Sequence, residues 1–150
     1  MCLVVSIPND YSCRIRSYEE ITLGATASIS KTITNEDVHK FASLIDDTNP
    51  VHLDPEYAKS TMFGEQIAHG MHSASFFTTL IADYLPGLKG VYLSQEIKFL
   101  RPVRIGDTVT AQAEVIGKNE EKRRLTLKTT LHNQNGELVI DGQAVIAVMK

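Results

Sequence analysis

The sequence predicts an α+β protein in which an antiparallel sheet packs against one buried helix. The second half of the chain reads as four strands joined by turns, and a hairpin signal, Asn135-Gly136, separates the last two. The segment over residues 69–85, just before these strands, is apolar nearly all the way round a helix. Long strands beside one apolar helix favour a sheet with the helix on its face. The four expected strands cover residues 91–101, 108–117, 124–133 and 139–148.

One strand and two helices are expected before this segment. Residues 25–34 alternate small or apolar residues with Ser, Thr and Lys, which is typical of a strand. Thr34, Glu36 and Asp37 then provide a capping residue and an acidic first turn for a helix that runs to about residue 46. Asp54 and Pro55 open a second, short helix, with proline just inside its start.

The apolar segment 69–85 is expected to be buried. A helix of this length that is apolar all round needs cover on every side in a soluble protein. Ala74, Ser75, Thr78 and Ala82 form a stripe of small residues along it, so a neighbouring element can approach that face closely. The strands of the second half are the expected neighbour.

The composition is that of one ordinary globular domain. We place this domain at residues 17–150, behind a loosely attached extension at residues 1–16. An apolar fraction of 43% and a net charge of −3 give no electrostatic reason to expect nucleic-acid binding. Cys2 and Cys13 make no disulfide framework, which favours a reducing cytoplasm. No apolar run reaches the length of a membrane span.

The residues from Asp47 to His52 read Asp-Thr-Asn-Pro-Val-His and put a carboxylate and an imidazole five positions apart. Pro50 lacks an N–H and pushes Asn49 toward extended backbone, so Asn49 should end the preceding helix. A rigid turn between an acid and a base can aim both at one bound water, as general acid–base chemistry near neutral pH requires. The spacing alone equally allows a plain turn with a packed surface histidine.

A second motif, Ile67-Ala68-His69-Gly70-Met71, follows the first. The two motifs in this order resemble the (R)-specific enoyl-CoA hydratases of the MaoC-like, or hydratase 2, family. The resemblance covers roughly residues 17–148 and implies the hot-dog fold, a curled antiparallel sheet wrapped around a long central helix. Many members have glycine just before the motif aspartate, where this chain has Asp46. The likeness also includes Tyr57-Ala58, Gly90-Val91-Tyr92-Leu93-Ser94-Gln95, Phe99-Leu100-Arg101-Pro102-Val103 and Ile105-Gly106-Asp107.

The resemblance implies reversible addition of water to a trans-2-enoyl-CoA, which gives the (R)-3-hydroxyacyl-CoA. It assigns Asp47 and His52 to the water and the proton. We expect Asp47 to deprotonate the water while His52 holds it and handles the second proton. Asn49 and Thr78 are expected to support this pair, although a bond from the Thr78 hydroxyl to its own helix is an equal alternative. No metal or organic cofactor is implied, because the thioester itself activates the double bond.

The main-chain N–H of Gly70 is the donor that the resemblance implies for the thioester oxygen. The first N–H groups of a helix have no partner inside it, and a glycine allows close approach. The alternative is that Gly70 only relieves crowding at the helix entry. Met71 and Tyr92 are implied as substrate-binding residues, with ordinary core packing as their alternative.

Two histidines and three basic residues lie near these motifs. His69 is expected to support the loop rather than to act in catalysis. His72 stands where relatives have an apolar residue; with His69 and His52 it suggests a zinc site. No third ligand on the helix accompanies them, so no metal is predicted. The nearby cations that could meet the CoA phosphates are Lys98, Arg101 and Arg104.

The expected partners are an acyl-CoA thioester and at least one further copy of the chain, with no nucleic acid and no membrane. Hot-dog relatives pair their sheets across a two-fold axis, which covers an otherwise open edge. The rival functions are a hot-dog thioesterase, a dehydratase acting on acyl-carrier-protein substrates, and a non-enzymatic module that binds acyl thioesters. The intact pair of Asp47 and His52 argues against the binding module, since binding alone needs no acid and base.

Overall fold

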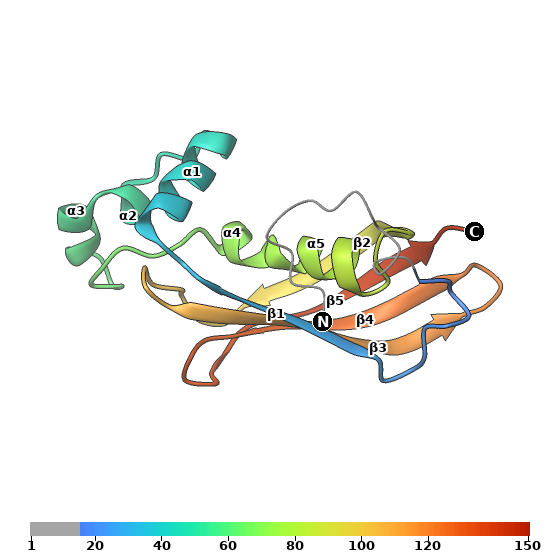
Figure 1. The fold of residues 1–150 in the computed structure, drawn as a ribbon. Coiled ribbons are helices and arrows are strands. Elements are labelled where there is room, and N and C mark those ends of the chain that lie inside the picture. The colour runs from blue at the N-terminus through green and yellow to red at the C-terminus, as the bar shows by residue number, and fades with distance from the viewer. Residues whose placement is uncertain (1–15) are drawn as a thin grey trace.

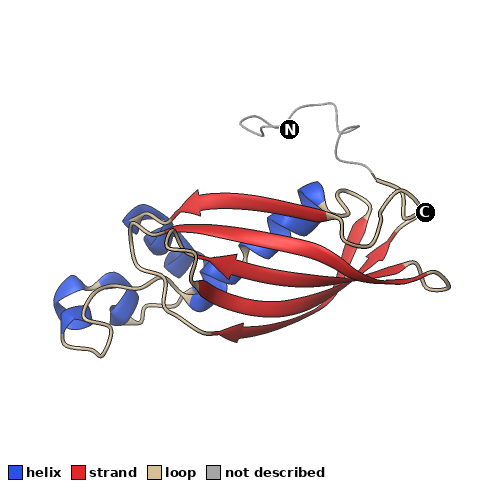
Figure 2. Cartoon of the chain, turned by 90° about the horizontal axis from the view of Figure 1, so that it is seen from below, coloured by secondary structure: helices blue, strands red, loops and turns tan. Residues whose placement is uncertain are grey.

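The computed structural model describes residues 16–150, so nearly all of the expected extension at residues 1–16 lies outside the described residues. Five strands form one antiparallel sheet in the order β1-β3-β4-β5-β2 (Figures 1 and 2). The strands are β1 (Thr26–Thr32), β2 (Gly90–Phe99), β3 (Thr108–Asn119), β4 (Arg124–His132) and β5 (Leu138–Val148). All five expected strands are therefore confirmed, with ends that differ by at most two residues.

One face of the sheet carries the core. Along β3, Val109, Ala111, Ala113 and Val115 are buried while the residues between them are partly or fully exposed. This alternation is typical of a strand with one covered face, since successive side chains point to opposite sides. Buried residues from β4 and β5 continue the same layer.

The central helix lies along this face in three consecutive pieces (Figure 1): α4 (Gly70–Ala74), α5 (Phe76–Thr79) and the π-helical turn η2 (Leu80–Tyr84). Its position is as expected from the sequence, but its burial is not. Phe77, Leu80 and Ile81 pack into the core, whereas Ser75, Thr78 and Ala82 are exposed. The expectation of cover on every side is wrong for the single chain, because one open sheet covers only one side of a helix. Of the small-residue stripe, only Ala74 is buried, and the other three residues face away from the sheet.

Three helices form a separate group beyond one end of the sheet (Figure 1). They are α1 (Asn35–Ile45), α2 (Pro50–Leu53) and α3 (Pro55–Lys59). The start of α1 is a capping box between Thr34 and Asp37, as its sequence indicated. Together the sheet and the helix on its face make the hot-dog fold, which confirms the fold class. No helix in the described part of the chain is long and apolar enough to cross a membrane.

The end of α1 differs from the expectation. The helix ends at Ile45, because Asp46 adopts the left-handed conformation with φ of 57° and its N–H bonds to the carbonyl of Ala42. Asn49 therefore does not end α1; instead it caps α2, where its Oδ1 accepts a bond from the Val51 N–H at 3.1 Å. The left-handed backbone explains why glycine is common at position 46 in relatives.

Candidate active site

The main chain positions both Asp47 and His52. Asp47 follows the cap of α1, and its Oδ1 accepts a bond from the Asn49 N–H at 3.0 Å. His52 lies on α2, and its Nδ1 is 2.7 Å from the carbonyl oxygen of Ile67. Because a carbonyl can only accept, the proton of neutral His52 resides on Nδ1 and leaves Nε2 as the nitrogen that can exchange protons.

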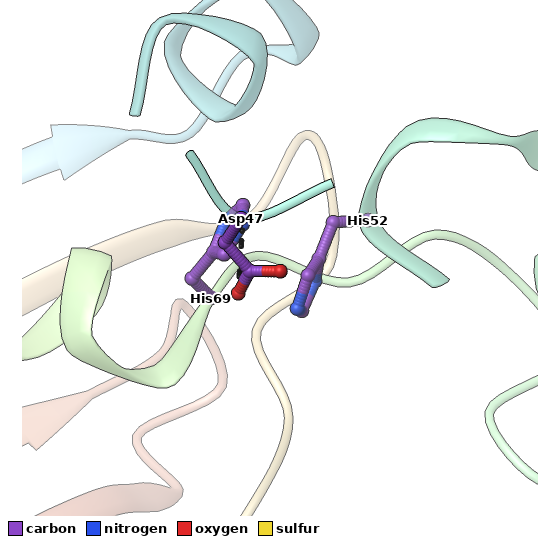
Figure 3. Close-up of side chains that lie close together, drawn as sticks. All are labelled: Asp47, His52 and His69. Carbon is purple, nitrogen blue, oxygen red and sulfur yellow. Dashed lines mark ion pairs between the residues drawn. The ribbon is translucent and has the colours of Figure 1, made fainter. Parts of the chain in front are cut away.

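A third side chain, His69, meets this pair (Figure 3). Its Nε2 lies 3.6 Å from Oδ2 of Asp47, and its ring stacks on that of His52 with centroids 3.8 Å apart and planes 27° apart. One donor atom from each of Asp47, His52 and His69 lies within 4.8 Å of the others. Burial lowers the pKa of His69, and the neighbouring His52 acts in the same direction, so His69 is neutral at neutral pH.

These three residue types can bind a metal ion, but the ring geometry does not suit one. An imidazole binds a metal through a lone pair in its ring plane. Two stacked rings send these lone pairs side by side, which does not suit the short, in-plane bonds to a metal ion but still allows the longer and more bent hydrogen bonds to a bound molecule. His72, which the sequence had grouped with the other two histidines, lies apart: it stacks on Phe41 at 4.9 Å and packs near Phe76 at 5.7 Å.

A cavity of about 390 Å³ includes Gly70, the first residue of α4, in its lining. The ring of Phe99 crowds this glycine, because a Cβ built on Gly70 would lie 2.8 Å from Cε1 of Phe99. That contact supports the crowding alternative for Gly70, and it leaves the oxyanion role as a prediction. The cavity is lined by Met62, Phe63, Ile67, Ala68, Gly70, Ser73, Phe99, Leu100, Arg101, Pro102, Val103, Val139 and Ile140.

The remaining predicted site residues lie outside this cavity. Thr78 is exposed on α5, and no hydrogen bond among the described residues links it to Asp47. Met71 is 59% exposed. Tyr92 packs against the core and donates a hydrogen bond to Gln95, which is the core-packing alternative of the sequence analysis. Asn49 does contact Asp47, although through its main-chain N–H.

The three candidate cations for the CoA phosphates have different surroundings. Arg101 lines the cavity and lies 4.0 Å from Glu137. Arg104 pairs with Glu65 at 2.5 Å, and Lys98 is exposed on β2. Arg101 is therefore the cation best placed for a group that enters the cavity.

Sequence reasoning grouped His69 with His52 only as conceivable zinc ligands, and it missed the contact of His69 with Asp47 and the contact of Phe99 with Gly70. Both join residues from distant elements, so no local spacing indicates them. The only available signal was that His69 directly precedes Gly70 at the start of the helix.

Together, the fold and the site define a hot-dog protein with an acid–base pair beside the entry to its central helix. The family model of the MaoC-like domain matches residues 20–136. The chain belongs to the MaoC-like family. It is 45% identical to the (R)-specific enoyl-CoA hydratase of Rhodospirillum rubrum, over 87% of this chain and 90% of that protein. It is also 42% identical to the (R)-specific enoyl-CoA hydratase of Aeromonas caviae, over 87% of this chain and 97% of that protein. The solved structure of the A. caviae (R)-hydratase, described as involved in PHA biosynthesis, superposes with a TM-score of 0.85 and 41% identity, covering 87% of this chain and 98% of that one.

Proposed function

We propose that this chain is an (R)-specific enoyl-CoA hydratase, a hydro-lyase that adds water reversibly to a trans-2-enoyl-CoA. The observation that carries this proposal is the meeting of Asp47 and His52 in one small volume, together with His69, the residue that precedes the glycine at the start of the central helix (Figure 3). The similarity over most of the chain to two proteins named for this activity supports it.

Hydration moves one proton and one hydroxyl. The Asp47 carboxylate takes a proton from the water as the water oxygen attacks C3. That proton passes to the free Nε2 of neutral His52, which delivers it to C2, so Asp47 and His52 end the cycle in the protonation states in which they began. The hydrogen bond from His52 Nδ1 to the Ile67 carbonyl fixes the ring, so Nε2 is the nitrogen that transfers the proton.

Negative charge develops on the thioester oxygen during this attack. The Gly70 N–H is the donor proposed for it, because it opens the helix and has no side chain of its own. The ring of Phe99 must leave room for that oxygen, since it packs directly against Gly70.

Coenzyme A is the proposed carrier, because the two relatives reported above are named as enoyl-CoA enzymes. The cavity beside Gly70 would hold part of the thioester, with Arg101 at its lining for a phosphate. Acyl-carrier-protein dehydration and thioester hydrolysis are the less favoured functions.

A homodimer is the proposed assembly, and the cytoplasmic location stays a prediction. Of the two strands at the ends of the sheet order, β2 exposes large apolar side chains, whereas β1 exposes mainly Ser, Thr and Lys. An apolar strand edge needs a partner in water. The exposed apolar residues of β2 are Val91, Leu93 and Phe99.

Product analysis with crotonyl-CoA tests the proposed function. Loss of conjugation with the thioester intact, together with (R)-3-hydroxybutyryl-CoA as product, is the expected result. Release of free thiol would identify a thioesterase, and no turnover of CoA or carrier-protein thioesters would identify a binding module.

A further inference from the structure

His69 presents an unexplained buried donor. Its side chain is 3% exposed, and neither ring nitrogen makes a hydrogen bond of good geometry among the described residues, although the Asp47 main chain lies near enough to oppose the lowering of the His69 pKa. A neutral imidazole carries one N–H, and leaving a buried N–H without an acceptor is unfavourable. A bound molecule is the usual partner of such a group.

The distances around His69 fit a water. Its Nε2 is 3.6 Å from Oδ2 of Asp47, which is too long for a direct hydrogen bond but suits a bridging water. One donor atom from each of Asp47, His52 and His69 lies within 4.8 Å of the other two. Because 4.8 Å is the upper limit of these separations, a group can lie within about 2.8 Å of all three atoms, which is hydrogen-bond distance.

The proton inventory is also consistent with a water held by all three groups. The Asp47 carboxylate only accepts, and the bond of His52 Nδ1 to Ile67 leaves the Nε2 of neutral His52 as an acceptor. The nearby carboxylate favours the proton of neutral His69 on Nε2, so His69 donates. The water would then donate to Asp47 and His52, accept from His69, and keep one lone pair for the substrate.

We propose that His69 is a third catalytic residue, which binds the attacking water through its Nε2–H and fixes the direction of its free lone pair. This inference rests on the proposed hydratase function and adds a residue to it. Burial keeps His69 neutral at neutral pH, so it orients the water without competing for the proton that Asp47 takes. The His69 imidazole is held in place by its stacking on the His52 ring and by the Phe41 ring, whose centroid lies 5.2 Å from that of His69.

Three variants separate donation from packing. His69→Gln keeps an N–H donor, His69→Met has similar length without a donor, and His69→Phe keeps a ring for the stack. We expect His69→Met and His69→Phe to lose about 10²-fold in kcat with little change in KM, as for loss of one preorganised donor. His69→Gln should retain markedly more kcat than either.

His72→Phe is the matched control. His72 lies on the same helix, is also buried and also stacks on Phe41, but it does not belong to the group around Asp47. It should keep near-wild-type kcat. Circular dichroism and thermal unfolding identify any variant that fails to fold. If His69→Phe does not fold, the comparison of kcat between His69→Gln and His69→Met tests the role of the N–H donor.

Each outcome has one meaning. An inactive wild-type protein would remove the proposed function itself. An active wild type with His69→Met or His69→Phe as fast as His69→Gln would overturn only the role of His69. Zn²⁺ is a further test. If the wild type binds it tightly and His69→Gln does not, the three residues hold a metal ion instead of a water, and this inference is also overturned.

Discussion

Separate main-chain groups hold the side chains of Asp47 and His52 in position. A substitution at one of the two residues should therefore leave the position of the other side chain nearly unchanged. We predict that Asp47→Asn and His52→Ala each remove nearly all hydratase activity and leave the fold intact. Asn keeps the size of Asp47 and can still accept the bond from the Asn49 N–H, but it cannot take a proton from water. Positioned acid–base groups contribute about 10²–10⁴ in rate. Steady-state kinetics with crotonyl-CoA, with circular dichroism alongside, measure this.

The double variant tests whether the two residues act on one water. Residues that work as a unit are not additive, so the double variant should be little slower than the worse single one. A multiplicative loss would instead mean that Asp47 and His52 act in separate steps.

Gly70 needs a variant that separates crowding from oxyanion binding. A side chain at Gly70 meets the ring of Phe99, so we predict the effect of Gly70→Val in a Phe99→Ala background. Relative to Phe99→Ala alone, Gly70→Val should lower kcat by about 10²–10³, because it blocks approach to one oxyanion donor. Equal kcat in the two proteins would favour the crowding role for Gly70.

At the scale of elements, the end of α1 carries strain that a glycine would relieve. Asp46 holds a φ of 57°, which costs an L-residue more than glycine. We predict that Asp46→Gly raises the free energy of unfolding by up to about 1 kcal/mol and leaves kcat near wild type. Urea denaturation measures it. Asp46→Ala lacks glycine's freedom, and alanine tolerates the left-handed conformation less well than Asp, so this variant should be less stable than either. A destabilised glycine variant would contradict the argument.

The contact between α1 and α4 makes stability depend on pH. Burial lowers the pKa of His72 and of His69 below the ordinary value of 6.5, and the Asp37 carboxylate opposes this only in part for His72. Below about pH 6.5 the unfolded chain therefore binds protons that the folded chain does not. The free energy of unfolding should fall as pH drops from 7.5 to 5.5.

His72→Phe should make that fall smaller, because it removes one buried titrating ring and keeps an aromatic side chain against Phe41. Urea denaturation at the two pH values and one fixed protein concentration gives the comparison. An equal fall in both proteins would mean that His72 does not contribute.

For the whole molecule, the open edge at β2 predicts a dimer that one charge can weaken. Leu93 on β2 is 46% exposed, and Glu in its place would bury a charge in the proposed interface. We predict that light scattering finds a dimer for the wild type and a shift toward monomer for Leu93→Glu. Ile116→Glu on β3 is the matched control, because Ile116 is 47% exposed on a strand that is not at the edge. A wild-type monomer at all concentrations would refute the dimer.

The sequence by itself determined the features that depend on neighbouring residues. The alternation along β3, the capping box at Thr34 and the turn at Asn135-Gly136 are local, so their elements could be predicted closely. The spacing from Asp47 to His52 allowed this acid and base to come together across a short turn, and the family resemblance carried by the motif predicted that they do.

Tertiary structure alone decided the features that depend on which distant surfaces pack together. The sheet covers only one side of the central helix, so Thr78 faces outward although its own segment reads as buried. The Phe99 ring reaches Gly70 from β2, and His69 reaches His52 because the Ile67 carbonyl and the central-helix entry lie against α2. Side-chain periodicity indicates which face of an element is apolar, but it does not indicate which other element covers that face. The covering element is decided by close packing between segments that are distant in the sequence.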